Sequence, residues 1–394
     1  MNSTAPTHTH LHFPGFRFRE KEIIRILAQW DAGNGVLLTG IRRTGKSELM
    51  KAALYRYAQQ GQPVSYLDVQ AEDNLARFYQ NLLSALLTHL PVTLKDQFIT
   101  ALGTVLKLPD SLSRWVRQQI SKVSIPEVVE IELQPQQEQL LRYWKPLTDQ
   151  IAAHIKACGP NDTPVIGIDE LPFMLENLMN KGVPPNEIVV MLASLRTLRD
   201  AGLRVIIGGS ISFENLLSIH SIPHTVLGGL FRLPVLPFSR SEAQSYLSET
   251  LAGRFAANPE AITLVLDNLP DYVPEVLKIA HGFLVTCENL DACSDSLANE
   301  IMPGVRRAFL QQFDERLTKN YSSDELSCAE QILDAVAQGD ASGTRLDGRQ
   351  LPSGYHRVLS RLQYDNFIVD APDLGWRFSL NLIRLWWRAS RGMA

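Results

Sequence analysis

Residues 40–47 read GIRRTGKS and match the full pattern G-x-x-x-x-G-K-[ST]. Glycines let the backbone wrap closely around an anion, so that the N–H groups of residues 43–46 point at phosphate oxygens. Lys46 then reaches the β- and γ-phosphates, and the hydroxyl of Ser47 binds Mg²⁺. The spacing predicts a nucleotide-binding loop formed by Gly40, Arg43, Thr44, Gly45, Lys46 and Ser47.

A second group of chemical interest is the acidic pair at the end of VIGIDE, residues 165–170. Asp169 is expected to hold magnesium through water, and Glu170 is expected to polarise the attacking water as general base. Two acids at the end of a strand can also act as a plain cap before a turn. Together with the phosphate-binding loop, the pair favours a site that hydrolyses a nucleotide.

An acid directly after the aspartate indicates the P-loop class that has an extra strand between the P-loop strand and the acidic strand. In that arrangement residues 205–207 fill the gap, and the GGS of residues 208–210 emerges beside the γ-phosphate. Ser210 is therefore predicted to sense the phosphate. A small residue in a tight turn is the alternative reading.

The elements that position these residues follow from the hydrophobic pattern. Five short apolar segments resemble buried strands, and stretches with helical spacing lie between them. This alternation predicts an α/β fold with a mainly parallel sheet covered on both faces. The predicted strands are 36–39, 64–69, 165–168, 205–207 and 233–236, and the predicted helices are 19–31, 47–59, 75–90 and 187–201.

The chain divides into several predicted parts. Residues 1–15 read as a flexible terminus and 16–238 as a P-loop ATPase core, with an insertion at 91–162. The insertion carries helical patterns at 95–107 and 136–157 and a strand-like alternation at 122–133. Residues 239–302 are wholly helical and predict a lid, with Ser239 and Ser241 as N-caps and helices at 242–251, 259–269 and 274–284. From residue 303 to 394, three helices and a β-ribbon at 367–378 predict a winged helix.

Composition excludes some classes of protein. The chain has 394 residues, and 38 Lys and Arg against 42 Asp and Glu give a net charge of -4, so it does not coat nucleic acid by charge alone. Four scattered cysteines indicate neither a disulfide scaffold nor a structural zinc site. No apolar run is long enough to span a bilayer, and the first residues lack the order of a signal peptide. We therefore expect a cytoplasmic protein without a membrane partner.

Several motifs together resemble the archaeal-type ATPase family, a STAND branch of the P-loop ATPases related to AAA+ initiators. They are GIRRTGKS, IDE, IIGGS, FRLPVLPFS and RFSLNLIRLWWR. FRFRE at residues 16–20 is similar to the family's F-x-G-R-E box near the adenine, which implies a nucleotide contact for Arg19, although Phe18 replaces the usual glycine. The resemblance also implies an adenine contact for Pro274 and a catalytic arginine, for which Arg232 is the nearest candidate. A salt bridge to the lid is the alternative role for Arg232.

The C-terminal module leaves its partner open. Its expected recognition helix, residues 355–362, brings His356, Arg357 and Arg361 to one side, which would suit the major groove of double-stranded DNA. From residue 303 onward, however, 12 Lys and Arg face 11 Asp and Glu, without the basic excess that duplex binding normally shows. A winged helix can equally bind a protein partner or dock on the ATPase.

These features predict a Mg²⁺- and ATP-dependent switch, in which ATP binds between core and lid and hydrolysis changes the position of the lid and winged helix. Basal turnover is expected to be low if an arginine must come from a neighbouring subunit of a homo-oligomer. Two alternatives remain: a DNA-bound AAA+-type initiator or loader, and a signalling or defence scaffold with a protein partner.

Overall fold

The computed structural model describes residues 18–89, 96–97, 100, 134–159, 163–209, 212–349 and 351–393. The chain folds into two compact units. The first comprises Met1–Thr39 and Lys46–Pro234, and the second comprises Gly40–Gly45 and Val235–Ala394. Ser210, the predicted flexible terminus, the strand-like segment at 122–133 and most of the predicted helix at 95–107 lie outside the described residues. Within the described residues, no helix is both long and apolar enough to cross a membrane.

The first unit is built on a five-stranded, fully parallel sheet with the order β2-β3-β4-β1-β5. Strand β4 lies between β1 and β3, so the extra strand expected from the acidic pair is confirmed. The three central strands are wholly or almost wholly buried, because helices cover both faces. The strands are β1 Gly35–Thr39, β2 Val64–Asp68, β3 Val165–Asp169, β4 Arg204–Ile207 and β5 Leu230–Pro234.

The predicted bounds of the fifth strand, residues 233–236, are shifted, and only residues 233 and 234 lie in the observed strand. Strand β5 spans Leu230–Pro234 and pairs with β1 from Gly35↔Leu230 to Thr39↔Pro234. It is an edge strand in which Phe231 and Arg232 are exposed, so its apolar residues do not mark its extent. Proline lacks the N–H that a ladder needs, which suits Pro234 to the end of an edge strand.

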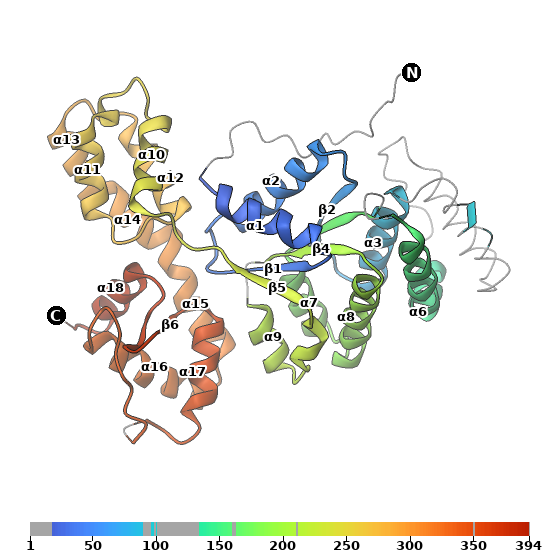
Figure 1. Ribbon diagram of the computed structural model, residues 1–394. Coiled ribbons are helices and arrows are strands. Elements are labelled where there is room, and N and C mark those ends of the chain that lie inside the picture. The colour runs from blue at the N-terminus through green and yellow to red at the C-terminus, as the bar shows by residue number, and fades with distance from the viewer. Residues whose placement is uncertain are drawn as a thin grey trace. The chain divides into compact units, whose positions relative to one another are not determined.

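Helices pack on both faces of the sheet. Figure 1 shows α1 and α2 on one face and α7, α8 and α9 on the other. The second face carries a large hydrophobic cluster, to which α3 and α6 also contribute. The bounds are α1 Glu20–Asp31, α2 Lys46–Gln59, α3 Leu75–His89, α6 Gln134–Ala157, α7 Leu171–Asn180, α8 Pro185–Asp200, α9 Phe213–Ile219 and the 3₁₀ turn η1 His224–Leu227.

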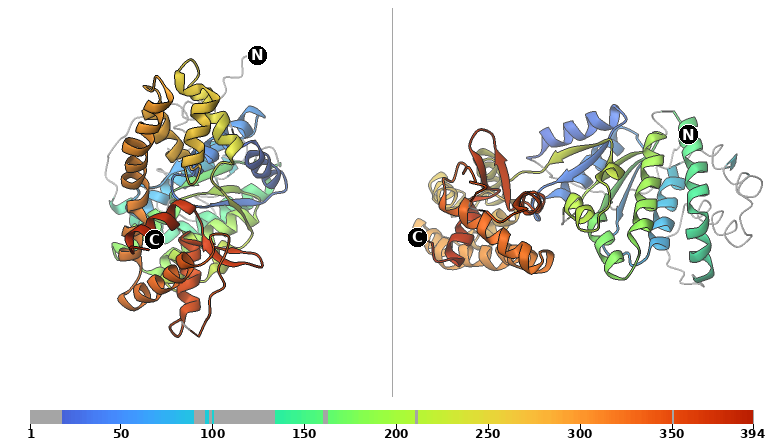
Figure 2. Two further views of the ribbon diagram at one scale, coloured as in Figure 1. Left: turned by 90° about the vertical axis from the view of Figure 1, so that its left-hand side faces the viewer. Right: turned by 90° about the horizontal axis from the view of Figure 1, so that it is seen from below.

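The second unit is helical apart from one antiparallel ribbon, β6 Ile368–Ala371 and β7 Gly375–Phe378, drawn in red in Figure 2. Ser239 caps its first helix in a capping box with Glu242, as predicted, whereas Ser241 lies inside that helix. The helices are α10 Arg240–Thr250, α11 Pro259–Asn268, α12 Pro274–Leu284, α13 Leu290–Ser296, α14 Met302–Val305, α15 Gln311–Asn320, α16 Ser323–Gln338, α17 Tyr355–Tyr364 and α18 Asn381–Ser390, with the 3₁₀ turn η2 Phe255–Ala257 and the π-helical turns η3 Leu297–Ile301 and η4 Arg306–Leu310.

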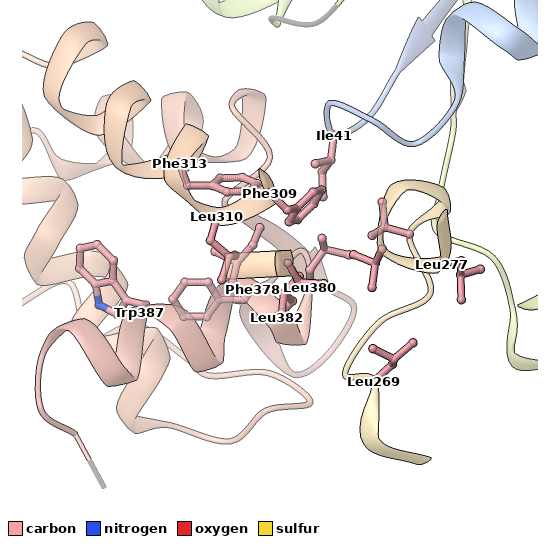
Figure 3. Close-up of a cluster of buried hydrophobic side chains, with 14 of the residues drawn as sticks. Ile41, Leu269, Leu277, Phe309, Leu310, Phe313, Phe378, Leu380, Leu382 and Trp387 are labelled. Carbon is pink, nitrogen blue, oxygen red and sulfur yellow. The ribbon is translucent and has the colours of Figure 1, made fainter. Parts of the chain in front are cut away.

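One hydrophobic core runs through this unit from α10 to α18. Leu269 and Leu277, from the predicted lid, belong to the same cluster as Phe309, Phe378 and Trp387, from the predicted winged helix (Figure 3). Pro303 lies inside α14, within helical turns that run from residue 290 to 320. The segments predicted as lid and as winged helix therefore share one core within the second unit.

Candidate nucleotide-binding site

The first turn of α2 holds the two side chains that the motif assigns to phosphate and metal. Lys46 is the first residue of this 14-residue helix and is only 6% exposed, and Ser47 follows it. The N–H groups at a helix N-terminus point outward, and the helix dipole adds partial positive charge there. The end of α2 that follows β1 is therefore built for an anion.

The loop before α2 packs with the second unit. Gly40 has a φ of +128°, and a Cβ at this position would lie 2.7 Å from the carbonyl oxygen of Val235, so only glycine fits. Ile41 is buried and points toward Phe309 in the core of the second unit (Figure 3). Thr44 is also buried, and its hydroxyl donates to the carbonyl of Ile41 at 2.8 Å. These contacts constrain the shape of the loop.

The remaining loop positions have their own constraints. Gly45 has a φ of +88°, in the region that favours glycine, whereas Arg43 adopts a φ of 69° as a non-glycine residue. The guanidinium of Arg43 forms an ion pair with Glu275 at 3.1 Å. Glu275 lies in the first turn of α12, which begins at Pro274. The structure thus links the predicted phosphate loop to the helix that carries the predicted adenine contact.

Asp169 lies at the carboxyl end of β3, is 3% exposed, and has a partner for each carboxylate oxygen. Its Oδ1 accepts the backbone N–H of Glu170 at 3.1 Å, and its Oδ2 accepts the hydroxyl of Tyr66 at 2.9 Å. Burial, and then the negative charge of Asp169, raise the pKa of Tyr66 above its ordinary value. No local pattern in the sequence indicates Tyr66. Its only signal would have been the pairing of β2 with β3, which places Asp68 opposite Asp169.

Glu170 occupies a strained backbone position. It has φ 59° and ψ 25° at the N-cap of α7, and its side chain makes no capping hydrogen bond. The alternative of a plain cap therefore has no capping bond from Glu170 behind it, although Asp169 accepts the N–H of Glu170. A left-handed conformation costs about 1 kcal/mol or more for a residue with a side chain and persists where the surroundings demand it. The strain here sharply redirects the chain directly after Asp169.

The loop after β4 leaves no room for larger side chains. A Cβ on Gly208 would lie 3.0 Å from Cε of Met50 and 3.3 Å from Oδ1 of Asp169. A Cβ on Gly209 would lie 2.7 Å from Pro172. Because Met50 is one turn along α2 from Ser47, these contacts place the start of α2 and Asp169 at the same end of the sheet.

The residues at this end fit a magnesium nucleotide. Ser47 and Asp169 supply hydroxyl and carboxylate oxygens, the ligands that Mg²⁺ prefers, and Mg²⁺ usually takes only one or two protein side chains beside phosphates and water. Small residues at Gly45 and Gly208 allow close approach of the backbone. The carboxyl ends of parallel strands are also where ligands bind in open α/β sheets.

The segment that resembles the family's adenine box begins with an unusual backbone conformation. Phe18, which replaces the usual glycine, has a φ of 77°, in the region that favours glycine. Arg19 follows, is buried, and pairs with Glu22 on α1 at 3.1 Å. The backbone therefore keeps a glycine-like turn without a glycine.

Arg232 forms an ion pair within the first unit. Its Nε lies 3.0 Å from Glu214 of α9, and its side chain is 60% exposed. The alternative of a salt bridge was correct in kind, but the prediction that the partner lies in the lid was wrong. An edge strand leaves this side chain exposed beside α9, and a role toward a neighbouring subunit stays a prediction.

The expected recognition helix, α17, does not present all three of its predicted contacts. Arg361 is buried, with an ion pair to Glu325 at 2.6 Å and its guanidinium over the ring of Tyr321. Although burial raises the pKa of Glu325, hydrogen bonds from Arg361 and Ser322 outweigh it and lower that pKa. Arg357 is exposed. The prediction that Arg361 reaches a groove is wrong, because this side chain is needed inside the unit.

The order of strands, the loop between β1 and α2, and the acidic pair ending β3 define a P-loop nucleotide-binding fold of the class with an additional central strand. No protein-family model matches the chain, and no curated protein matches it. Among solved structures it is similar to a Walker-type ATPase of Pyrococcus abyssi, with 18% identity, a TM-score of 0.57, and coverage of 94% of this chain and 96% of that one.

Two other solved structures are more distant. The Aeropyrum pernix ORC2 protein in its ADP form shares 15% identity with a TM-score of 0.45, covering 95% of this chain and 96% of that one. AMPPCP-bound DnaA from Aquifex aeolicus shares 11% identity with a TM-score of 0.33, covering 84% and 73%. The likeness to the Pyrococcus protein confirms, at the level of fold, the predicted α/β P-loop core and its resemblance to archaeal-type ATPases.

Proposed function

We propose that this protein is an ATPase in which Mg·ATP acts as the ligand of a molecular switch. The observation that carries the proposal is the arrangement around the sheet end. A complete phosphate-binding motif joins β1 to α2, and Asp169 and Glu170 end β3, two strands away. Neither motif alone requires hydrolysis, but a buried carboxylate followed by a second acid at this place favours it.

Each residue has a definite task in this proposal. Lys46 balances phosphate charge at the N-terminus of α2, and Ser47 and Asp169 hold the magnesium ion directly or through water. Magnesium, when bound, neutralises charge that develops on the phosphates. Glu170 orients and deprotonates the attacking water. Gly40, Arg43, Thr44 and Gly45 provide backbone N–H groups, and Arg19, Pro274, Ser210 and Arg232 retain the roles that the resemblance implies.

The switch rests on the packing of the loop. Residues Gly40–Gly45 belong to the second unit by their contacts, while the strand before and the helix after them belong to the first. Ile41 is part of the second unit's core, and Arg43 pairs with Glu275. A ligand that changes the loop therefore acts directly on the helical lid and, through the shared core, on the C-terminal module.

Lys46→Ala tests the nucleotide site. The variant should lose at least about 100-fold in affinity for ATP, because a buried ammonium is removed from the phosphates. Calorimetric titration with a non-hydrolysable ATP analogue measures the loss, and circular dichroism checks the fold. Lys21→Ala removes an exposed lysine from α1 and is the matched control. Unchanged affinity in folded Lys46→Ala protein would overturn the assignment.

The partner is addressed by a separate measurement. Molecular mass in solution with ADP and with the analogue, repeated with duplex DNA at low salt, distinguishes three proposals. Nucleotide-dependent homo-oligomers without DNA favour the scaffold with a protein partner. Salt-sensitive, ATP-dependent retention on DNA favours the initiator or loader. The proposal of an ATP-dependent switch also includes a cytoplasmic location and a winged-helix fold for the C-terminal module.

A further inference from the structure

Tyr66 lies in the middle of β2, next to the strand that carries the acidic pair. In the parallel ladder Tyr66 lies opposite Gly167, and Asp68 lies opposite Asp169. Residues two apart on a strand share a face, so Tyr66 and Asp169 both point toward the side that α2 covers. A Cβ at Gly167 would meet Leu54 and Met50 of α2, which confirms which face this is.

The hydroxyl of Tyr66 reaches along the sheet to Asp169. It donates to Oδ2 at 2.9 Å, while the N–H of Glu170 donates to Oδ1 at 3.1 Å. The ammonium of Lys51, one turn beyond Ser47 on α2, lies 4.9 Å from the centre of the Tyr66 ring. Tyr66 therefore contacts both elements that carry the predicted magnesium ligands, β3 and α2.

A buried carboxylate needs donors, and two donors on different oxygens fix its rotation. Each oxygen has a further lone-pair direction, so these bonds orient Asp169 without using up its capacity to accept. Groups that hold a ligating side chain in this way usually change metal affinity by about 10- to 100-fold when they are removed. Tyrosine has an ordinary pKa of about 10, so its hydroxyl is a donor at neutral pH.

We propose that Tyr66 is a positioning residue for the magnesium site: its hydroxyl holds the Asp169 carboxylate in the orientation that receives the ion. The inference rests on the proposed function, because it concerns the same site. Tyr66 touches neither nucleotide nor reacting water in this role. It sets how strongly magnesium strengthens nucleotide binding, and it leaves binding without the metal unchanged.

The test is the ratio of ADP affinities with magnesium and with EDTA, measured by calorimetry. Tyr66→Phe removes one oxygen atom and should reduce this ratio about tenfold, with the affinity in EDTA unchanged. Tyr57→Phe is the matched control, because Tyr57 is a buried tyrosine of α2 whose hydroxyl donates to Asp31 at 3.2 Å. Its ratio should equal that of the wild type.

A double variant separates positioning from general destabilisation. If Tyr66 acts through Asp169, adding Tyr66→Phe to Asp169→Asn should not reduce the ratio further. A wild-type ratio in Tyr66→Phe, or full additivity in the double variant, would overturn the inference and leave the proposed function in place. Wild-type protein whose ADP binding ignores magnesium would instead overturn the proposed function, and the inference with it.

Discussion

In the first unit the groups that could do chemistry lie at the carboxyl end of the sheet, whereas in the second unit comparable groups are bound within the fold. Asp169 is held by two donors at a strand end, beside the start of α2. Arg361 of the second unit is buried between Glu325 and Tyr321. Asp169 and Arg361 both look functional in the sequence, but Asp169 lies at the end of a strand, whereas Arg361 is used as an ion-pair partner inside its unit.

The second unit uses further charges to stabilise helix ends. Asp271 accepts the backbone N–H of Leu382 at 2.6 Å and so caps α18, which has no side-chain cap of its own. Arg384 and Arg388 donate to the carbonyl of Ala337 near the C-terminus of α16. A charged residue in a sequence therefore indicates a ligand contact only if it is not used inside the fold. Unpaired backbone groups at helix ends and buried polar side chains need such residues as hydrogen-bond partners first.

The largest expected effect lies in the first unit and tests whether its acids are catalytic. Glu170→Gln should keep ATP affinity and lose at least about 100-fold in turnover, because the amide cannot act as a base. Asp169→Ala should in addition weaken binding that depends on magnesium. Steady-state hydrolysis with calorimetric binding measures both, and Glu187→Gln, on the exposed side of α8, is the control. Wild-type turnover in Glu170→Gln would mean that Glu170 is not the catalytic base, and the acids of the first unit would then differ from Arg361 only in position.

Arg361→Ala tests whether the second unit's arginine is structural. The change leaves Glu325 without its closest cationic partner and should lower the free energy of unfolding by about 3 kcal/mol. Arg357→Ala, on the same helix but 74% exposed, should cost less than about 0.5 kcal/mol. Urea unfolding of both variants gives the difference. If the two variants were equally stable and Arg361→Ala alone weakened duplex DNA binding, Arg361 would be a ligand contact after all.

The pH dependence of stability tests the Asp271 cap. Burial raises the pKa of Asp271 to about 6, although N–H donors from α18 and the charge of Arg377 oppose the rise. In the unfolded chain the pKa is about 3.9, so the folded state binds the proton more tightly and loses stability as pH rises through about 6. Between pH 5 and 7 this loss is about 1 kcal/mol.

Asp271→Asn keeps an acceptor oxygen and removes the titration. Relative to the wild type, its free energy of unfolding should therefore increase by about 1 kcal/mol between pH 5 and 7. Chemical denaturation at both pH values measures this difference. If the free energy of unfolding changed equally in both proteins between pH 5 and 7, Asp271 would not take up a proton in this pH range. Its charge would then be better solvated than its burial indicates.

The smallest expected effect concerns Arg232, whose ion pair with Glu214 is exposed on the arginine side. Arg232→Ala should change the free energy of unfolding by less than about 1 kcal/mol. If the arginine acts on a neighbouring subunit, mixing Arg232→Ala with Lys46→Ala should restore hydrolysis, because one intact pocket then receives an intact arginine. Two results would contradict a role toward a neighbouring subunit: co-assembly without recovered activity, or normal hydrolysis by Arg232→Ala alone. The function of Arg232 would then be its ion pair with Glu214.

The sequence was sufficient for the features that depend on short-range order. GIRRTGKS with its flanking strand and helix, the acidic pair, the extra strand and the span of α12 were all predicted, because loop, strand and helix signals lie within a few residues. The predicted β5 was shifted toward the C-terminus, since the edge strand exposes Phe231 and Arg232 and the apolar run extends past its end. Phe18, where the resemblance leads one to expect glycine, has a φ of 77°, in the region that favours glycine.

Only the tertiary structure decided which side chains meet across long separations. Tyr66 and Asp169 are 103 residues apart, Arg43 and Glu275 are 232 apart, and Asp271 and Leu382 are 111 apart. No local pattern records such pairs, because the energy that selects them comes from burial and hydrogen bonding after the elements have packed. For the same reason α17 looked like a basic recognition helix in the sequence, while the fold used Arg361 to satisfy Glu325 inside the second unit.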